Sequence, residues 1–181
     1  KGGIQAGQKV LINGASGGIG TFAVQIAKSF GAEVTGVCST RNLDLVRSIG
    51  ASEVIDYTQE DFAQGGEQYD LIFDIAGKRP VSDYAGALRP EGTFVSCAIS
   101  PAALLLGPLM SMFGSKKVVQ LSHSPSAADL AFMNELLEAG KVAPVIDRAF
   151  PLSEAARAVR YYEDNNPQGK VAITVGGSDQ D

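Results

Sequence analysis

The sequence KVLINGASGGIGTFAVQIAKSF, residues 9–30, decides the fold, because a short apolar run, a group of glycines and an amphipathic segment follow one another within it. Lys9–Asn13 predicts a buried strand, and Thr21–Phe30 predicts a helix whose apolar side chains recur about every four residues. The glycines between them are Gly14, Gly17, Gly18 and Gly20. The first predicted unit is therefore a strand, a glycine turn and a helix.

The same alternation continues downstream. Further strands are predicted at Glu33–Cys38, Glu53–Ile55, Tyr69–Ile75, Gly92–Ala98 and Lys117–Leu121, with helices at Asn42–Ile49 and Val81–Leu88 among them. Apolar strands that alternate with helices are typical of a parallel sheet covered on both faces. The predicted fold class is therefore α/β, with a Rossmann-type, doubly wound parallel sheet of about six strands.

The last part of the chain is predicted to be a C-terminal αβ tail. A helix with Ser126 as its N-cap is expected at Ser126–Ala139. The elements expected after it are a strand at Val145–Phe150, a helix at Glu154–Asp164 with Ser153 as N-cap, and a strand at Lys170–Val175. Because these strands have no evident place in the sheet, we divide the chain into residues 1–140, which contain the predicted parallel sheet, and residues 141–181, the tail.

Composition excludes several function classes. The 181 residues suffice for about one domain, and the net charge of −5 argues against a nucleic-acid or anionic-membrane surface. Two cysteines and one histidine cannot supply the usual Cys and His ligands of a zinc site, so no metal is expected. With no apolar run of about 18 residues and no evident signal peptide, a cytoplasmic protein is expected. The absence of an initiator Met at Lys1 suggests processing or excision from a longer protein.

The glycine turn indicates dinucleotide binding. A strict Gly-x-Gly-x-x-Gly is absent, because Ala15 stands first in the frame Ala15-x-Gly17-x-x-Gly20. In a strand–turn–helix context, however, glycines let a pyrophosphate approach the backbone amides at the positive end of the helix. The alternative is a tight turn with a purely structural role.

The end of the second predicted strand favours NADP(H) over NAD. An acidic residue about 20 positions after the turn would hold the adenosine ribose of NAD, but that region reads Ser39-Thr40-Arg41. Two hydroxyls and a guanidinium suit a 2′-phosphate, which a carboxylate would repel. The alternative is that Arg41 is merely a solvated residue at the start of a helix.

Two families share this kind of turn. The short-chain dehydrogenases require Tyr-x-x-x-Lys, and none of the five tyrosines has Lys four residues later. The chain instead resembles the zinc-independent, quinone-oxidoreductase-like branch of the medium-chain dehydrogenase/reductases, over nearly its whole length. The segments that carry the resemblance include Gly7–Ile12, Gly14–Gly20, Ala23–Lys28, Ile49–Ala51, Val54–Tyr57, Tyr69–Asp74, Gly140–Val142, Pro144–Asp147, Phe150–Leu152 and Gly169–Val171. It departs from the family at Asn42, where many relatives carry lysine.

The resemblance implies a Rossmann domain that binds NADPH in an oxidoreductase transferring hydride to a quinone, an activated carbonyl or a conjugated alkene. It implies cofactor-binding residues at the pyrophosphate loop, the 2′-phosphate pocket, the adenosine end, and the ribose and nicotinamide. In that order these are Ser16, Gly17, Gly18 and Ile19; Ser39, Thr40 and Arg41; Tyr57; and Ala76 and Ala98. The catalytic residues remain unknown at this stage.

The resemblance also implies an N-terminal GroES-like catalytic domain, which is expected to be missing because the chain begins just before the first predicted strand, and the tail from Lys141 would return to that domain. The resemblance therefore implies a missing partner domain of the same polypeptide, a homodimer and a small-molecule substrate, with little activity in the fragment alone. The alternative is a non-catalytic NADP(H)-binding sensor or scaffold module. His123, Cys38 and Cys97 are interpreted as structural residues. Within the apolar run Pro101–Phe113, the stretch Leu104–Phe113 is interpreted as a core or interface segment, and the alternative is a substrate pocket.

Overall fold

A six-stranded parallel sheet forms the centre of the computed structural model, which describes residues 2–97, 116–121, 124 and 126–176. The strand order is β3-β2-β1-β4-β5-β6, so the direction of winding reverses between β1 and β4. Cofactors of doubly wound sheets bind outside the carboxyl ends of the strands at such a reversal. The strands are β1 (Lys9–Asn13), β2 (Glu33–Cys38), β3 (Glu53–Asp56), β4 (Tyr69–Asp74), β5 (Leu88–Ser96) and β6 (Lys117–Gln120).

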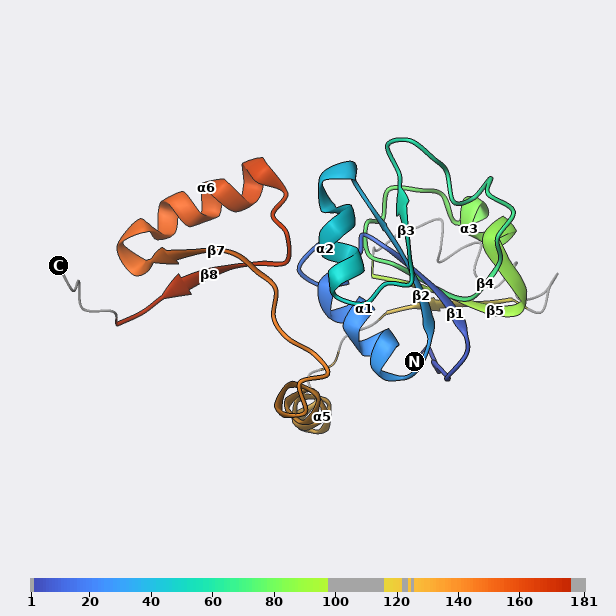
Figure 1. Ribbon diagram of the computed structural model, residues 1–181, viewed down its shortest axis with the longest axis horizontal. Helices are drawn as coiled ribbons and strands as arrows, with labels where there is room; N and C mark the ends of the chain where they lie inside the picture. The colour runs from blue at the N-terminus through green and yellow to red at the C-terminus, as the bar shows by residue number, and fades with distance from the viewer. Residues whose placement is uncertain (1, 98–115, 122–123, 125, 177–181) are drawn as a thin grey trace.

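Helices cover both faces of this sheet (Figure 1). On one face, α1 (Gly20–Ser29) and α2 (Leu43–Ser48), which follows the short 3-10 helix η1 (Thr40–Asn42), pack on an apolar cluster through Val24 and Val46. On the other, α3 (Val81–Ala87) packs on a second cluster through Tyr84. The predicted doubly wound α/β fold is confirmed, and the strands differ from their expected bounds by only a few residues.

A buried polar network joins β1 to β4 at their carboxyl ends. Asn13 donates from Nδ2 to Asp74 Oδ1 at 2.9 Å and to the Tyr84 hydroxyl at 3.0 Å. All three side chains are buried, and burial together with the neighbouring carboxylate raises the pKa of Tyr84. The two strand ends that flank the reversal are thus held together by specific hydrogen bonds, in the interior where unpaired polar groups are costly.

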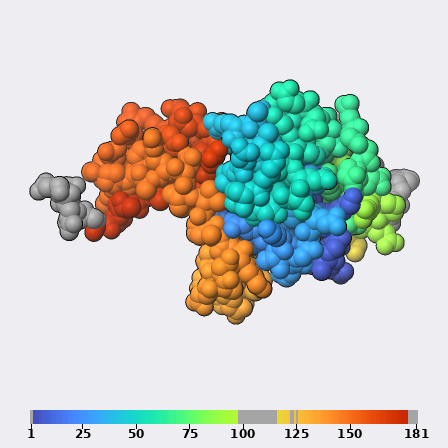
Figure 2. All heavy atoms as spheres, viewed as in Figure 1, coloured from blue at the N-terminus to red at the C-terminus, as the bar shows by residue number. Residues whose placement is uncertain are grey.

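The C-terminal part lies to one side of the six-stranded sheet (Figure 1 and Figure 2). After α5 (Ala127–Glu138), the strands β7 (Ile146–Pro151) and β8 (Lys170–Thr174) form a separate parallel pair around α6 (Ala155–Asn165). The N-cap expected at Ser126 is confirmed, because its side chain accepts from Asp129 N. The N-cap expected at Ser153 is wrong. The chain there turns first through the 3-10 helix η2 (Leu152–Glu154), so that Glu154 precedes α6.

The C-terminal pair leaves large apolar side chains at the surface. Exposed members are Ile146, Leu152, Val159, Tyr162, Ile173 and Val175. A helix packed on two strands buries only one side of each element, so these residues have no covering layer within the described part of the chain. Within that part, no helix has the length and apolar character that crossing a membrane requires. Ala98, Pro101–Phe113 and His123 lie outside the described residues.

Candidate functional site

The glycine turn lies where β1 ends and α1 begins, and two of its glycines are required by geometry. Gly14 has a φ of +91°, a conformation that favours glycine. A Cβ on Gly20 would lie only 2.0 Å from Gly14 O. Only glycine at position 20 therefore lets the start of helix α1 lie so close to the turn. A turn that cradles a pyrophosphate requires such close packing.

The start of α1 is suited to an anion. No side chain caps the helix at Ile19, and its first turn contains no acidic residue. Amide groups at a helix N-terminus have no partner within the helix and lie at its positive end. Ile19 is 51% exposed, so the surface at the start of α1 is open to solvent. Backbone amides and an open surface thus lie together at the predicted pyrophosphate loop.

A lysine from the far end of the chain lies over the same turn. A Cβ on Gly18 would come within 3.0 Å of Lys170 Nζ and 3.1 Å of Gly169 O. Gly169 N donates to Ser16 O at 2.9 Å, which fixes the start of β8 against the turn. Lys170 therefore places a cation beside the loop, and sequence reasoning did not assign it to the site. The Gly169–Val171 motif was visible, but its nearness to Gly18 depends on folding.

Asn42 joins the turn to the end of β2. Its Nδ2 donates to Ser16 Oγ at 2.9 Å and to Ser39 Oγ at 3.2 Å, and its Oδ1 accepts from Gln168 Nε2 at 2.7 Å. The side chain is buried and has partners for both of its polar atoms. The structure therefore brings Ser16 and Ser39 together through Asn42, the position at which the sequence departs from the family.

Thr40 and Tyr57 lie at the outer end of this region. Thr40 Oγ1 donates to Asp56 and lies 3.0 Å from Thr58 Oγ1. The hydrogen bond from Thr40, with further bonds from Thr58, lowers the pKa of Asp56, so this carboxylate stays ionised at neutral pH. Tyr57 N donates to Cys38 O at 3.1 Å, and its side chain is 57% exposed.

Arg41 is held by the C-terminal part of the chain. Its Nη2 donates to the carbonyl oxygens of Asn165 at 2.7 Å and of Asn166 at 2.6 Å, at the C-terminal end of α6. Arg41, Asn165 and Asn166 line a pocket of about 230 Å³ together with Asp147 and Tyr161. The Tyr161 hydroxyl donates to Asp147 Oδ2 at 2.6 Å. Arg41 is close to Ser39 in the sequence, but its guanidinium group donates hydrogen bonds to the end of α6.

Ala76 borders the turn from the side of β4. A Cβ on Gly14 would lie 3.4 Å from Ala76 N, and Gly77 N donates to Asp74 Oδ1 at 3.2 Å. Ala76 is exposed at the carboxyl end of β4, beside the reversal in strand order. Of the two alanines expected to line the cofactor, Ala76 is thus next to the turn, and Ala98 lies outside the described residues.

The described residues do not fit a zinc site. Among them, no group of three or more His, Cys, Asp or Glu side chains could hold a metal ion. Burial raises the pKa of the Cys38 thiol to about 11 and also raises the pKa of Cys97, so neither is a thiolate at neutral pH. Cofactor binding, by contrast, fits the tight turn and the nearby cation.

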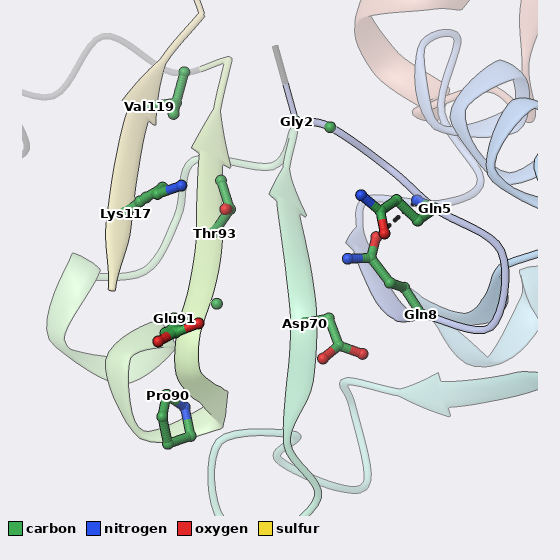
Figure 3. Close-up of a pocket in the computed structure, with 11 residues that line it drawn as sticks. Gly2, Gln5, Gln8, Asp70, Pro90, Glu91, Thr93, Lys117 and Val119 are labelled. Atoms are coloured by element: carbon green, nitrogen blue, oxygen red, sulfur yellow. Dashed lines mark hydrogen bonds between the residues drawn. The ribbon is translucent and has the colours of Figure 1, made fainter. Parts of the chain in front are cut away.

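A larger pocket of about 520 Å³ lies away from this region, near the amino ends of β4 and β6 (Figure 3). Its polar groups include Asp70 and Lys117. Asp70 accepts from Lys9 N at 2.8 Å and from Arg89 at 2.9 and 3.0 Å. These hydrogen bonds join Asp70 in β4 to the first residue of β1 and to β5, so the Asp70 carboxylate has a structural role.

Comparisons with known proteins agree with this geometry. A sequence model described as zinc-binding dehydrogenase matches residues 49–173. The chloroplastic quinone-oxidoreductase QR1 of Triphysaria versicolor is 35% identical over 92% of this chain and 52% of its own length. The trans-enoyl reductase pgmF of Aspergillus terreus is 32% identical over 94% of this chain and 52% of its own.

The solved structures include the quinone oxidoreductase from Coxiella burnetii, with a TM-score of 0.85 and 27% identity. The match covers 97% of this chain and 55% of that one. The chain thus spans about half the length of the relatives it matches.

Proposed function

The chain belongs to the zinc-binding dehydrogenase family, and we propose that it is the cofactor-binding part of an oxidoreductase that transfers hydride from NADPH to a quinone, an activated carbonyl or a conjugated alkene. The observation that carries the proposal is the turn itself. Gly20 lies against Gly14 O, and Lys170 lies over Gly18, so a tight backbone cradle and a cation meet at the start of α1. Relatives named as quinone oxidoreductase and trans-enoyl reductase support this substrate range.

In the proposed complex, the pyrophosphate lies on the amides of Ser16–Ile19, with Lys170 as its counter-ion. Ser39, Thr40 and Arg41 face the 2′-phosphate. Tyr57 lies near the adenosine, and the ribose and nicotinamide lie along Ala76 and Ala98. When bound, the cofactor supplies the hydride. The residues of this chain bind and orient it.

Turnover requires a second wall around the nicotinamide. Hydride transfer needs the substrate to be held against the cofactor in a site that excludes water. We assign residues 1–140 to cofactor binding and residues 141–181 to a tail that returns to a GroES-like catalytic domain. The exposed apolar side chains around β7 and β8 support such a partner, because they have no covering layer among the described residues. A homodimer and a cytoplasmic location remain predictions, and QR1 is named as chloroplastic.

Titration of the purified chain with NADPH and NADH tests the proposal. We expect saturable binding of NADPH, followed by nicotinamide fluorescence, and no oxidation of NADPH when a quinone is added. Absence of binding for both nucleotides would contradict the cofactor site. Rapid oxidation of NADPH by this chain alone would contradict the need for a second domain.

A cofactor-sensing or scaffold module is the second candidate. The observation that favours it is the exposed apolar surface around β7 and β8, because such surfaces bind other proteins. The upstream reading frame discriminates between the two candidates. A GroES-like domain encoded before Lys1 supports the oxidoreductase, whereas a translation start close to Lys1 supports the module.

A further inference from the structure

The C-terminal segment of the chain holds the predicted 2′-phosphate pocket by direct hydrogen bonds, and we call residues 165–169 the clasp. Within it, the carbonyl groups of Asn165 and Asn166 accept from Arg41 Nη2. Gln168 Nε2 donates to Asn42 Oδ1 at 2.7 Å and to Arg41 O at 3.3 Å. Gly169 N donates to Ser16 O at 2.9 Å. The clasp therefore contacts both the pyrophosphate turn and η1, and Figure 1 shows the C-terminal unit beside α2.

We propose that the end of α6 competes with the 2′-phosphate of the cofactor for Arg41, so that the clasp lowers the preference of this chain for NADPH over NADH. The inference rests on the role of Arg41 given under Proposed function. It adds that Arg41 must exchange a carbonyl partner for the phosphate when NADPH binds.

The exchange follows from the shape of the guanidinium group. A guanidinium grips a phosphate with two parallel N–H groups, either from Nη1 and Nη2 or from Nε and Nη2. Nη2 belongs to both of these edges and has only two hydrogens. In this structure it makes two hydrogen bonds, to Asn165 O and Asn166 O. With both contacts in place, neither edge of Arg41 can offer a phosphate two free N–H groups.

The surroundings of Arg41 also oppose a phosphate while the clasp is in place. The last carbonyl groups of α6 form the negative end of an 11-residue helix. The Asp147 carboxylate lines the same pocket of about 230 Å³. A 2′-phosphate that approached Arg41 here would meet carbonyl and carboxylate oxygens. NADH has no phosphate at this position, so its binding does not disturb the clasp.

Asn166 offers a way to weaken the clasp without changing Arg41. It ends α6 in the left-handed region, with a φ of +45°. Glycine adopts this conformation freely, whereas a β-branched residue strongly disfavours it. Asn166→Gly should therefore keep the carbonyl in place, and Asn166→Val should displace it.

Two small nucleotides isolate the effect of the phosphate: adenosine 2′,5′-bisphosphate and adenosine 5′-monophosphate, with affinities measured by calorimetry. We expect Asn166→Val to bind the bisphosphate about fivefold or more tightly than the unchanged chain, with no change for the monophosphate. Asn166→Gly should match the unchanged chain for both nucleotides. In the Arg41→Ala background the gain from Asn166→Val should disappear, because the cation for which the carbonyl groups and the phosphate compete is gone.

Equal or weaker binding of the bisphosphate by Asn166→Val would overturn the competition, as would a gain that persists without Arg41. In both cases the cofactor site itself could still stand, since the monophosphate reports on it separately. Failure of both nucleotides to bind the unchanged chain would overturn the cofactor site and the competition together.

Hydrogen exchange on the unchanged chain tests the same exchange of partners without relying on a variant that folds. The bisphosphate should increase amide exchange in residues 163–168, and the monophosphate should not. Equal or greater protection of these amides by the bisphosphate would show that the phosphate and the clasp bind together, contrary to the proposal.

Discussion

Lys170 and Gly18 are separated by most of the chain, yet a Cβ on Gly18 would lie 3.0 Å from the Lys170 ammonium nitrogen. The first residue of β8 therefore lies over the turn that follows β1. A cation at the amides of a helix N-terminus adds charge to a site that already attracts anions. The proposed cofactor site is thus made by both ends of the described chain.

Replacement of Lys170 by alanine should weaken NADPH binding by about tenfold, because one charge-assisted contact to the pyrophosphate is lost. Lys170→Arg should restore most of the affinity. Binding is measured by nicotinamide fluorescence at two salt concentrations, and the variant should show the weaker dependence on salt. Lys141→Ala removes an exposed lysine after α5 and serves as the control for net charge. Equal losses in the two alanine variants would count against a specific role for Lys170.

The glycines of the turn should separate folding from binding. Gly20→Ala places a Cβ 2.0 Å from Gly14 O and should destabilise the fold by more than about 3 kcal/mol. At Gly17 the nearest atom to an added Cβ is Gly14 O at 3.6 Å, so Gly17→Ala should fold normally. Its methyl group should nevertheless weaken NADPH binding, since it occupies the surface that the pyrophosphate approaches.

Thermal unfolding and nucleotide titration of the same samples measure both effects. Gly86→Ala, in α3, is the control, because an added Cβ there has no neighbour within 4 Å. If Gly17→Ala bound NADPH with unchanged affinity, the pyrophosphate would have to bind at another site.

The Asp56 carboxylate should make stability depend on pH in the acid range. Its pKa in the folded chain is lowered from 3.8, first by the hydrogen bond from Thr40 and further by those from Thr58. A lowered folded pKa means that the contribution to stability is complete above the unfolded value and is lost as the pH falls through the folded value. Urea unfolding between pH 6 and pH 2 should therefore show a smaller acid loss in Asp56→Asn. Asp44→Asn, at an exposed side chain, should keep the full loss.

The network at the ends of β1 and β4 should contribute to stability through the Tyr84 hydroxyl. Tyr84→Phe removes an acceptor of Asn13 Nδ2 in a buried site, and the free energy of unfolding should fall by about 1 kcal/mol. Tyr162→Phe removes a hydroxyl from a side chain that is 61% exposed and should change little. Denaturant unfolding measures both values, and a neutral result for Tyr84→Phe would mean that Asn13 finds another acceptor.

Most of the sheet domain could be predicted because its signals are local. The strands β1 and β2 have the predicted bounds, and the glycine turn lies between a strand and a helix as its sequence indicates. Periodicity and turn chemistry act over a few residues, so they are legible in the chain itself. At Ser153 the local sequence was ambiguous, because a serine just before a helix is compatible with an N-cap and also with a short 3-10 helix. The structure places Ser153 within η2.

The partners of the site residues could not be predicted, because they come from distant parts of the chain. Arg41 bonds to carbonyl groups 124 and 125 residues further along, and Asn42 accepts from Gln168. A backbone carbonyl has no signature in the amino-acid sequence, so no motif could have revealed it. The sequence by itself determined the class of fold and the turn that suits a pyrophosphate. Only the tertiary structure decided which groups surround that turn, because long-range packing brings α6 and β8 against it.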